Sequence, residues 1–320
     1  MSKVAAKKKT ARGRKPIRYS KEDLERQPML MLVCGETGVG KTYRMVQEIK
    51  HYMKDNPDTG KKGRKVLIFD VNDDDYPSFR TVSPNHIKAL TAIRARRIRP
   101  INKDGIPMDL TQKREVVEKI LQHYRNGLLV LDDLDQYMVG AKGQSMIGAL
   151  CTVRHIGLDI VIAHQSVSKI TRTEFENCSW LRMHQQVDDI TRPALRERIP
   201  KYHLVRIANL IVEEQYMKAC QAFDQGLIDK EEWKKRKSFF VYVNMRQQKI
   251  RGCSKEAFIR ACKKYIDTEE ESQVRRMMKE KDLNGTLLNP ERKQVMINLI
   301  EKYLRLYDSS WLSPMQQDVK

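Results

Sequence analysis

The feature that most constrains the fold of this chain is the run GETGVGKT, residues 35–42, which directly follows the apolar stretch 29–34. An apolar strand, then G-x4-G-K-[ST], then a helical stretch predicts a phosphate-binding loop. Glycines at this spacing let backbone N–H groups curl around a β-phosphate, and the helix N-terminus adds a favourable field. The predicted nucleotide-binding residues are therefore Gly35, Glu36, Thr37, Gly38, Val39, Gly40, Lys41 and Thr42.

Two side chains of this loop carry specific predicted roles. Lys41 is expected to reach the β and γ oxygens of a triphosphate and to act in catalysis, and Thr42 to offer its hydroxyl to a metal ion. The ligands that this chemistry requires are ATP and Mg²⁺. The alternative, a chance match in a glycine-bearing turn, is disfavoured by the strand before the loop and the helical stretch after it.

A second apolar run, residues 127–131, ends in two carboxylates, Asp132 and Asp133. Such a run is typical of a buried parallel strand, whose tip would meet the phosphates. Asp132 is expected to hold Mg²⁺ through its water shell, and Asp133 to orient and deprotonate the attacking water. Glutamate is more usual in the second role, and the side chain of Asp133 is one methylene shorter, which reduces its reach. Asp135 is a weaker third candidate. Surface acids that cap a helix are the alternative interpretation.

Two further residues belong to the predicted catalytic set. Gln165 follows a strand at 159–163, where a polar side chain can bind the γ-phosphate or the attacking water. Arg154 lies on a helix just before that strand and could act as a finger into the site of a neighbouring subunit. The alternatives are a polar residue that merely ends a strand, and an arginine that interacts with a helix dipole.

Length and composition bound the class of protein. A chain of 320 residues can hold one α/β core with additional elements. No apolar run approaches the roughly 18 to 20 residues of a membrane span, and the N-terminus lacks the apolar segment of a signal peptide. The six cysteines are scattered without a CxxC pair, so we expect reduced thiols and a cytoplasmic location.

The net charge of +20 is unevenly distributed: residues 1–18 contain eight Lys or Arg residues and no acid. A polyanionic partner is the simplest explanation, because Lys and Arg side chains near phosphates release condensed counterions. The densest internal cluster, in a stretch that looks like a loop, is expected either to touch nucleic acid or to be solvated; it comprises Arg94, Arg96, Arg97, Arg99 and Lys103.

Strand and helix signals alternate along most of the chain, which predicts an α/β fold with a mostly parallel sheet and helices on both faces. The predicted parts are a basic tail (1–20), a nucleotide-binding domain (21–254) and a helical C-terminal extension (255–320). Residues 239–243 and 248–252 are expected to form edge strands, and 81–110 resist assignment. The apolar stripe of the last helix faces either its own core, the favoured option, or a neighbouring subunit; it comprises Val295, Met296, Leu299, Ile300, Tyr303 and Leu306.

The acid-rich segment 69–76 follows the second predicted strand. Its carboxylates could position a phosphate or a neighbouring subunit, and a solvated acidic turn is equally consistent with the pattern.

Taken in order, the loop, the acid-rich segment, the double-acid strand, the Arg154–Leu158 run RHIGL and the strand closed by Gln165 resemble the FtsK–HerA superfamily of DNA-pumping P-loop ATPases. Within it, the chain is most similar to viral genome-packaging ATPases, over residues 28–252. The resemblance implies a RecA/FtsK-like fold, Gln165 as a polar sensor and Arg154 as a candidate finger.

The same resemblance implies a homo-oligomeric ring, commonly a hexamer, that moves DNA past basic loops by contacts with its phosphates. Capsid or vertex proteins are further candidate partners, and the expected location is the host cytoplasm or the virion. One alternative is an assembly or secretion ATPase resembling the zonular occludens toxin-like proteins, which usually carry a membrane helix. Another is a replication ATPase that remodels proteins on DNA.

Overall fold

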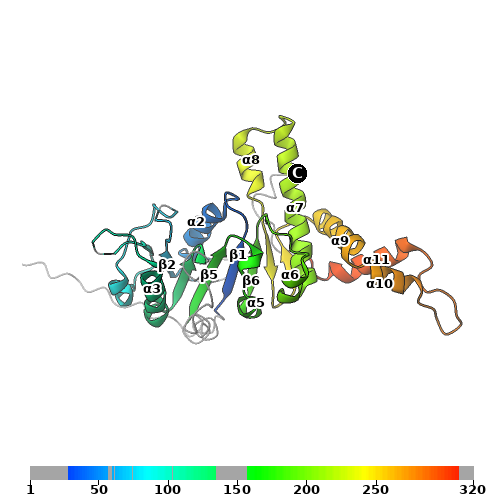
Figure 1. The fold of residues 1–320 in the computed structure, drawn as a ribbon, viewed down its shortest axis with the longest axis horizontal. Helices are drawn as coiled ribbons and strands as arrows, with labels where there is room; N and C mark the ends of the chain where they lie inside the picture. The colour runs from blue at the N-terminus through cyan, green and yellow to red at the C-terminus, as the bar shows by residue number, and fades with distance from the viewer. Residues whose placement is uncertain are drawn as a thin grey trace, which may run out of the picture.

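Eight strands form a single mixed sheet in the computed structural model, which describes residues 28–56, 60, 62–73, 75–102, 104–134 and 157–309 (Figure 1). The order across the sheet is β3-β2-β4-β5-β1-β6-β7-β8. Strands β1 to β6 run parallel to one another, β7 pairs antiparallel with β6, and β8 pairs antiparallel with β7. Of the two predicted edge strands, β8 lies at the edge, whereas β7 lies between β6 and β8. The strands are β1 (Leu30–Cys34), β2 (Lys65–Phe69), β3 (Ala95–Ile98), β4 (Gly127–Leu131), β5 (Leu158–His164), β6 (Trp180–Met183), β7 (Val241–Asn244) and β8 (Lys249–Arg251).

The pairing register aligns the carboxyl ends of three central strands. Strand β5 lies between β1 and β4, with Cys34 opposite His164 and Leu131 opposite Ile162. Each of these strands is fully buried, as expected for parallel strands covered on both faces. The segments that follow the three strands therefore emerge at one edge of the sheet.

Alternate strand residues divide the interior into two apolar clusters, one on each face of the sheet. The larger cluster contains Leu32, Phe69 and Ile162 together with buried residues of α3, α5 and α7. The smaller contains Val33 and Val161, and α2 is the only described helix that contributes buried residues to it. Helices thus cover both faces, and the predicted fold class is confirmed.

Local sequence explains most helix boundaries. Helix α2 begins directly after the loop, at Gly40 in the left-handed conformation. Capping boxes begin α3, from Asp109 and Gln112, and α5, from Thr171 and Glu174. The helices are α2 (Lys41–Tyr52), η1 (Pro84–Ala89), α3 (Leu110–His123), η4 (Val167–Lys169), α5 (Arg172–Asn177), α6 (Pro193–Arg198), α7 (Tyr202–Asp224), α8 (Lys230–Lys237), α9 (Lys255–Glu269), α10 (Glu271–Met278) and α11 (Arg292–Leu304).

The C-terminal helices extend sideways from the sheet, whereas the hairpin of α7 and α8 stands away from it (Figure 1). Buried residues of α9, α10 and α11 belong to the larger apolar cluster. The stripe of the last helix joins the same cluster, with Val295, Leu299, Tyr303 and Leu306 buried. The stripe therefore faces its own core, as the favoured option predicted, while the proposed domain boundaries stay a prediction.

The stretch that resisted assignment contains η1 and the edge strand β3. Two of its basic residues, Arg96 and Arg97, lie on a strand and not on the predicted loop, because Ala95–Ile98 pair with β2 in parallel. Among the described residues, no helix is both long and apolar enough to span a membrane.

Replacing Leu299 with Ala should lower the free energy of unfolding by about 2 to 5 kcal/mol, since the side chain is 1% exposed and its loss leaves a cavity. Chemical denaturation of the purified chain measures this. The matched control is Ile297→Ala on the same helix, which is 40% exposed and should change stability by less than about 0.5 kcal/mol. Equal effects of the two substitutions would contradict the assigned face of α11.

Candidate nucleotide-binding site

The backbone of the loop 35–42 has the shape that phosphate binding requires. Gly38 and Gly40 have φ values of 83° and 77°, in the left-handed region that side chains other than glycine disfavour. Gly35 has no room for a side chain, because a Cβ there would lie 2.6 Å from the Cβ of His184. The amide of Glu36 is tied to the carbonyl of Gln185 at 2.8 Å, which fixes the loop to the segment after β6. The predicted loop is thus a preorganised turn that leads into α2.

Lys41 lies within the curve of this loop. Its Nζ donates to the carbonyl oxygens of Gly35 at 2.5 Å and Glu36 at 2.9 Å. Burial lowers the pKa of Lys41, whereas the negative charges of Asp133 and Asp132 act to raise it. The sequence-distant acids and the loop lysine therefore share one electrostatic environment, as the sequence predicted for a joint site.

A buried arginine on the neighbouring strand β6 holds the first turn of α2 in place. Arg182, on β6, is fully buried; its Nη2 donates to the carbonyl of Lys41 at 3.3 Å, and its Nη1 lies 2.7 Å from Glu48 on α2. Tyr242 donates to the same carboxylate. These contacts fix the helix N-terminus that carries Lys41 and Thr42.

Asp132 is held immediately beyond β4 and is 5% exposed. The hydroxyl of Tyr76 donates to its Oδ2 at 2.6 Å, and the amide of Asp133 donates to its Oδ1 at 3.1 Å. Burial raises the pKa of Asp132 to about 6, although the hydrogen bond from Tyr76 opposes this. At neutral pH the group is mostly ionised, as a cation site needs, but the ionised form is destabilising.

Asp133 takes an uncommon backbone conformation, with φ of 44°. Aspartate tolerates this region better than most residues, and such strain is enriched at functional sites. Its Oδ2 accepts a hydrogen bond from Asn72 Nδ2 at 3.3 Å. The side chain is only half buried, so it remains accessible for the predicted contact with an attacking water.

Gln165 directly follows β5, the strand that separates the loop strand from the acid strand. Its side chain is exposed at the carboxyl edge. A polar group between the two motifs can contact either a terminal phosphate or a water. The structure thus brings Lys41, Asp132, Asp133 and Gln165 to one edge, while the catalytic role of each stays a prediction.

Arg154, the predicted finger, lies outside the described residues, as do Asp135, Lys103 and the basic tail.

The acid-rich segment 69–76 supports the site through residues other than its carboxylates. Asn72 and Tyr76 hold the two acids after β4. The sequence pointed to this segment, but it assigned a role to the carboxylates and none to the amide of Asn72 or the phenol of Tyr76. Only the pairing of β2 with β4 brings these two side chains to Asp132 and Asp133.

The carboxylates of this segment instead neutralise part of the internal basic cluster. Arg97 Nη1 lies 2.7 Å from Asp70, and Arg99 Nη2 donates to Asp73 at 2.5 Å. The guanidinium of Arg99 holds the pKa of Asp73 below its usual value. These two arginines are therefore paired within the chain, which weakens the expectation that this cluster binds nucleic acid.

Sequence reasoning also missed His184, which packs beneath the loop. Neither ring nitrogen has a hydrogen-bond partner in the described parts of the chain, and the ring lies 5.1 Å from that of Phe240. Burial, reinforced by the charges of Arg182 and Lys41, lowers the pKa of His184 well below its usual value. The imidazole is therefore neutral, and no motif in the sequence singles it out.

The residues present fit a nucleotide with its metal ion. The left-handed glycines leave the loop N–H groups free of side chains, and Lys41 supplies the positive charge for phosphate oxygens. Within the described residues, no group of three His, Cys, Asp or Glu side chains could hold a metal ion. A magnesium ion that accompanies nucleotide phosphates takes one or two protein ligands, and Thr42 and Asp132 are the candidates.

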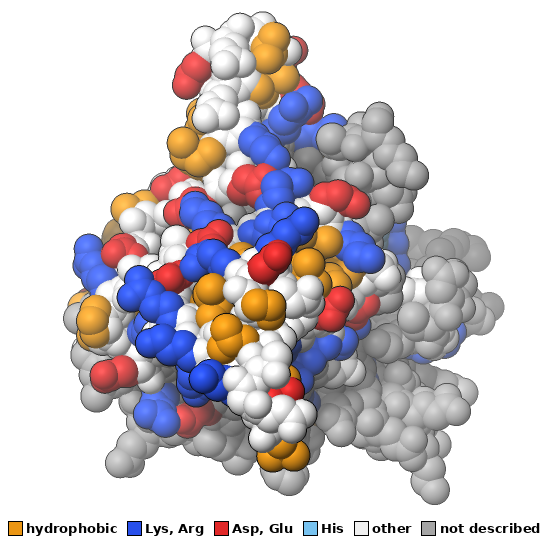
Figure 2. Space-filling model, turned by 90° about the vertical axis from the view of Figure 1, so that its right-hand side faces the viewer, with side chains coloured by type: hydrophobic (Ala, Val, Ile, Leu, Met, Phe, Trp, Pro, Cys, Tyr) orange, Lys and Arg blue, Asp and Glu red, His pale blue; other side chains and the backbone are white. Residues whose placement is uncertain are grey.

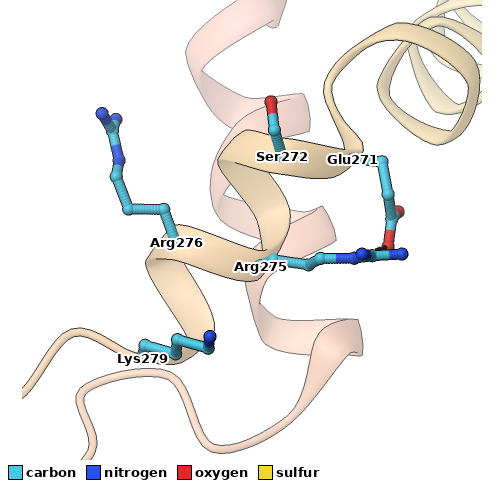
Figure 3. Close-up of a pocket in the computed structure, with 5 residues that line it drawn as sticks. All are labelled: Glu271, Ser272, Arg275, Arg276 and Lys279. Carbon is cyan, nitrogen blue, oxygen red and sulfur yellow. Dashed lines mark hydrogen bonds and ion pairs between the residues drawn. The ribbon is translucent and has the colours of Figure 1, made fainter.

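A separate hollow of about 510 Å³ lies on α10, in the C-terminal part of the chain (Figure 3). It is lined by Glu271, Ser272, Arg275, Arg276 and Lys279. Arg276 points away from the other two cations, and Arg275 turns to Glu271, with which it forms an ion pair at 3.1 Å (Figure 3). The cationic side chains do not converge on one point, so the loop 35–42 remains the better candidate for a phosphate-binding site.

The sequence matches the family model described as zonular occludens toxin (Zot) over residues 29–245, about two thirds of the chain. The chain belongs to the Zot family. The matched range of this Zot-family chain includes the loop, both acids, Gln165 and the buried Arg182. A search of curated proteins finds no match.

Three solved structures are similar to parts of this chain. The genome packaging NTPase B204 of Sulfolobus turreted icosahedral virus 2, in complex with AMPPCP, is 16% identical with a TM-score of 0.45, and the match covers 71% of this chain and 97% of that one. The N-terminal domain of zonular occludens toxin from Neisseria meningitidis is 16% identical with a TM-score of 0.32, over 52% of this chain and 81% of that one. The Legionella pneumophila ATPase DotB is 15% identical with a TM-score of 0.31, over 67% of this chain and 61% of that one.

Substituting Lys41 with Ala should reduce ATP turnover by at least about 100-fold, because the positive charge on the β and γ oxygens is lost. A coupled assay of phosphate release measures this, and circular dichroism checks that the fold is retained. Turnover at the wild-type rate would show that hydrolysis takes place elsewhere.

Asp132→Asn should abolish hydrolysis and yet stabilise the fold. The pKa of this buried acid is raised from 3.8 to about 6, so the carboxylate destabilises the folded state by up to about 3 kcal/mol above pH 6. Thermal unfolding of variant and wild type should therefore differ most at pH 8, and the difference should shrink as the pH falls from 6 to 4. A variant less stable than the wild type at pH 8 would contradict the assignment.

Proposed function

We propose that the chain couples ATP hydrolysis to movement of DNA, as a viral genome-packaging translocase that works in a homo-oligomeric ring. The supporting observation is that a phosphate loop, two acids and Gln165 meet at one edge of the sheet. This is the set of groups that ATP hydrolysis needs, and a switch that only binds nucleotide needs fewer.

The proposed chemistry gives each group of this site one role. The loop amides and Lys41 bind the phosphates. Thr42, and Asp132 through the water shell, would hold a magnesium ion, which would neutralise part of the phosphate charge. Asp133, half buried beside Asp132, orients and deprotonates the attacking water. Gln165, exposed between the two motifs, contacts the terminal phosphate or that water and loses this contact after hydrolysis.

The net positive charge of the whole chain supports DNA, a polyanion, as the substrate that is moved. Its excess of 20 positive charges includes the eight Lys and Arg residues of 1–18. Contacts with backbone phosphates need no base sequence, which suits an enzyme that must pass along an entire genome.

An oligomeric ring, with a hexamer favoured, is supported by the open side of the site. Thr37, Gly38 and Gln165 are exposed although they flank the phosphate position. A neighbouring subunit could close this side and supply an arginine, for which Arg154 is the candidate. In this proposal the ring acts in the host cytoplasm and docks on capsid or vertex proteins.

A second candidate function is ATP-driven assembly or secretion of phage particles, in the manner of zonular occludens toxin-like proteins. The family match over residues 29–245 favours it. It differs from the first proposal in the substrate, which would be virion protein and not DNA.

The rate of ATP hydrolysis should rise several-fold when double-stranded DNA is added to the purified chain, because bound DNA engages the subunits of the proposed ring. Lys41→Ala serves as the control for contaminating ATPases. Displacement of a roadblock from the DNA end then tests directional movement. An ATP turnover rate that is unchanged by DNA would overturn the first proposal and favour the second. Stimulation by DNA without displacement of the roadblock would favour a protein that remodels complexes on DNA.

A further inference from the structure

A two-helix arm, residues 213–238, projects from the nucleotide-binding body (Figure 1). It consists of the second half of α7, the turn around Gly226 and α8. The first half of α7 is buried in the core, whereas Ala219 is the only buried residue between 213 and 224, and α8 has none. The core therefore anchors the arm, but the core does not need the arm for its packing.

The arm maintains its shape through its own contacts. The rings of Phe223 and Trp233 stack across the two helices at 5.1 Å, and Lys237 Nζ lies 4.2 Å above the ring of Trp233. Asp229 caps α8 by accepting from the amide of Glu232 at 2.8 Å. A hairpin built in this way can move as one unit.

The base of the arm rests on the nucleotide loop. Ser238 follows α8 directly, and a Cβ added to Gly40 would lie 2.9 Å from the Cβ of Ser238. Arg44, on the first turn of α2, donates to Ser238 Oγ at 3.5 Å. A change of backbone at Gly40 on nucleotide binding would therefore press on the end of α8.

The charges of α8 are divided along its length. The acids Glu231 and Glu232 lie in the first turn, near the tip, and the last turn carries the consecutive bases Lys234, Lys235, Arg236 and Lys237. Figure 2 shows Lys and Arg side chains gathered below the tip of the arm. The C-terminal turn of α8, which carries the basic side chains, thus lies beside the nucleotide loop.

The bases of this turn remain available to an external anion. Lys234, Lys235 and Arg236 are 45 to 50% exposed and, among the residues that the structure describes, form ion pairs only with glutamates of their own helix. Exposed pairs of this kind contribute little to stability. A phosphate backbone can replace them, because release of its counterions drives binding.

We propose that the basic end of α8 binds the phosphate backbone of double-stranded DNA and transmits that contact to Gly40 through Ser238. This inference rests on the proposed function and assigns the contact to the arm and not to the arginine cluster of β3. In this proposal the arm connects bound DNA to the site that hydrolyses ATP.

The test compares two charge-reversed variants of the full chain. The arm variant carries Lys234→Glu, Lys235→Glu and Arg236→Glu. The matched control carries Arg275→Glu and Arg276→Glu on α10 and Lys279→Glu at its C-cap, which changes the net charge equally on exposed residues outside the arm. DNA affinity is measured by fluorescence anisotropy at several salt concentrations, and ATP turnover with and without DNA.

The arm variant should lose the DNA stimulation of turnover, and its slope of log affinity against log salt should flatten by roughly 2 to 3, because about three phosphate contacts disappear. The control should keep its stimulation and most of its slope. A neutral variant with glutamine at the same three arm positions, which preserves the helix, should show the same loss in weaker form.

Two outcomes would overturn the inference. One is an arm variant that is stimulated by DNA as strongly as the wild type, and the other is an equal loss in the arm variant and the control. Failure of the proposed function is distinguishable, since the wild type itself would then show no response to DNA.

Discussion

The pairing of β5 between β1 and β4 is the constraint on which the site depends. Because the ladder is parallel, all three strands end at the same edge, with Cys34 opposite His164. The loop after β1, Gln165 after β5 and Asp132 after β4 then emerge side by side. Alternate residues of each strand pack into the two different apolar clusters, and a slip by one residue would exchange them and disrupt the packing of both.

Buried charge is the second feature that shapes the site, and at Asp132 it works against stability. Asp132 is kept in a poorly solvated position with a raised pKa, and Arg182 is fully buried behind α2. Each is held by specific partners, Tyr76 for the acid and Glu48 for the arginine. The groups are thereby preorganised for a charged ligand, which replaces in part the solvation that folding removes.

The long helix α7 links this interior to the surface. Its first half is packed in the larger apolar cluster, where it also supports the C-terminal helices, and its second half continues into the exposed arm. Because Ser238 returns the arm to Gly40, the exposed last turn of α8 is connected to the nucleotide loop, as the proposed coupling requires. Such an arrangement lets the occupancy of one position bias the other.

The sequence alone determined the loop, the double-acid strand, Gln165 and the α/β class, because these depend on local patterns: glycine spacing, apolar runs and the residues that end them. It also predicted the core-facing side of α11 from its periodicity. Only the tertiary structure decided that Tyr76 and Asn72 hold the two acids, that Arg97 and Arg99 are neutralised, and that His184 and Ser238 touch the loop. These contacts join residues from separate strands and helices, and their positions follow from sheet order and burial, which no local pattern encodes.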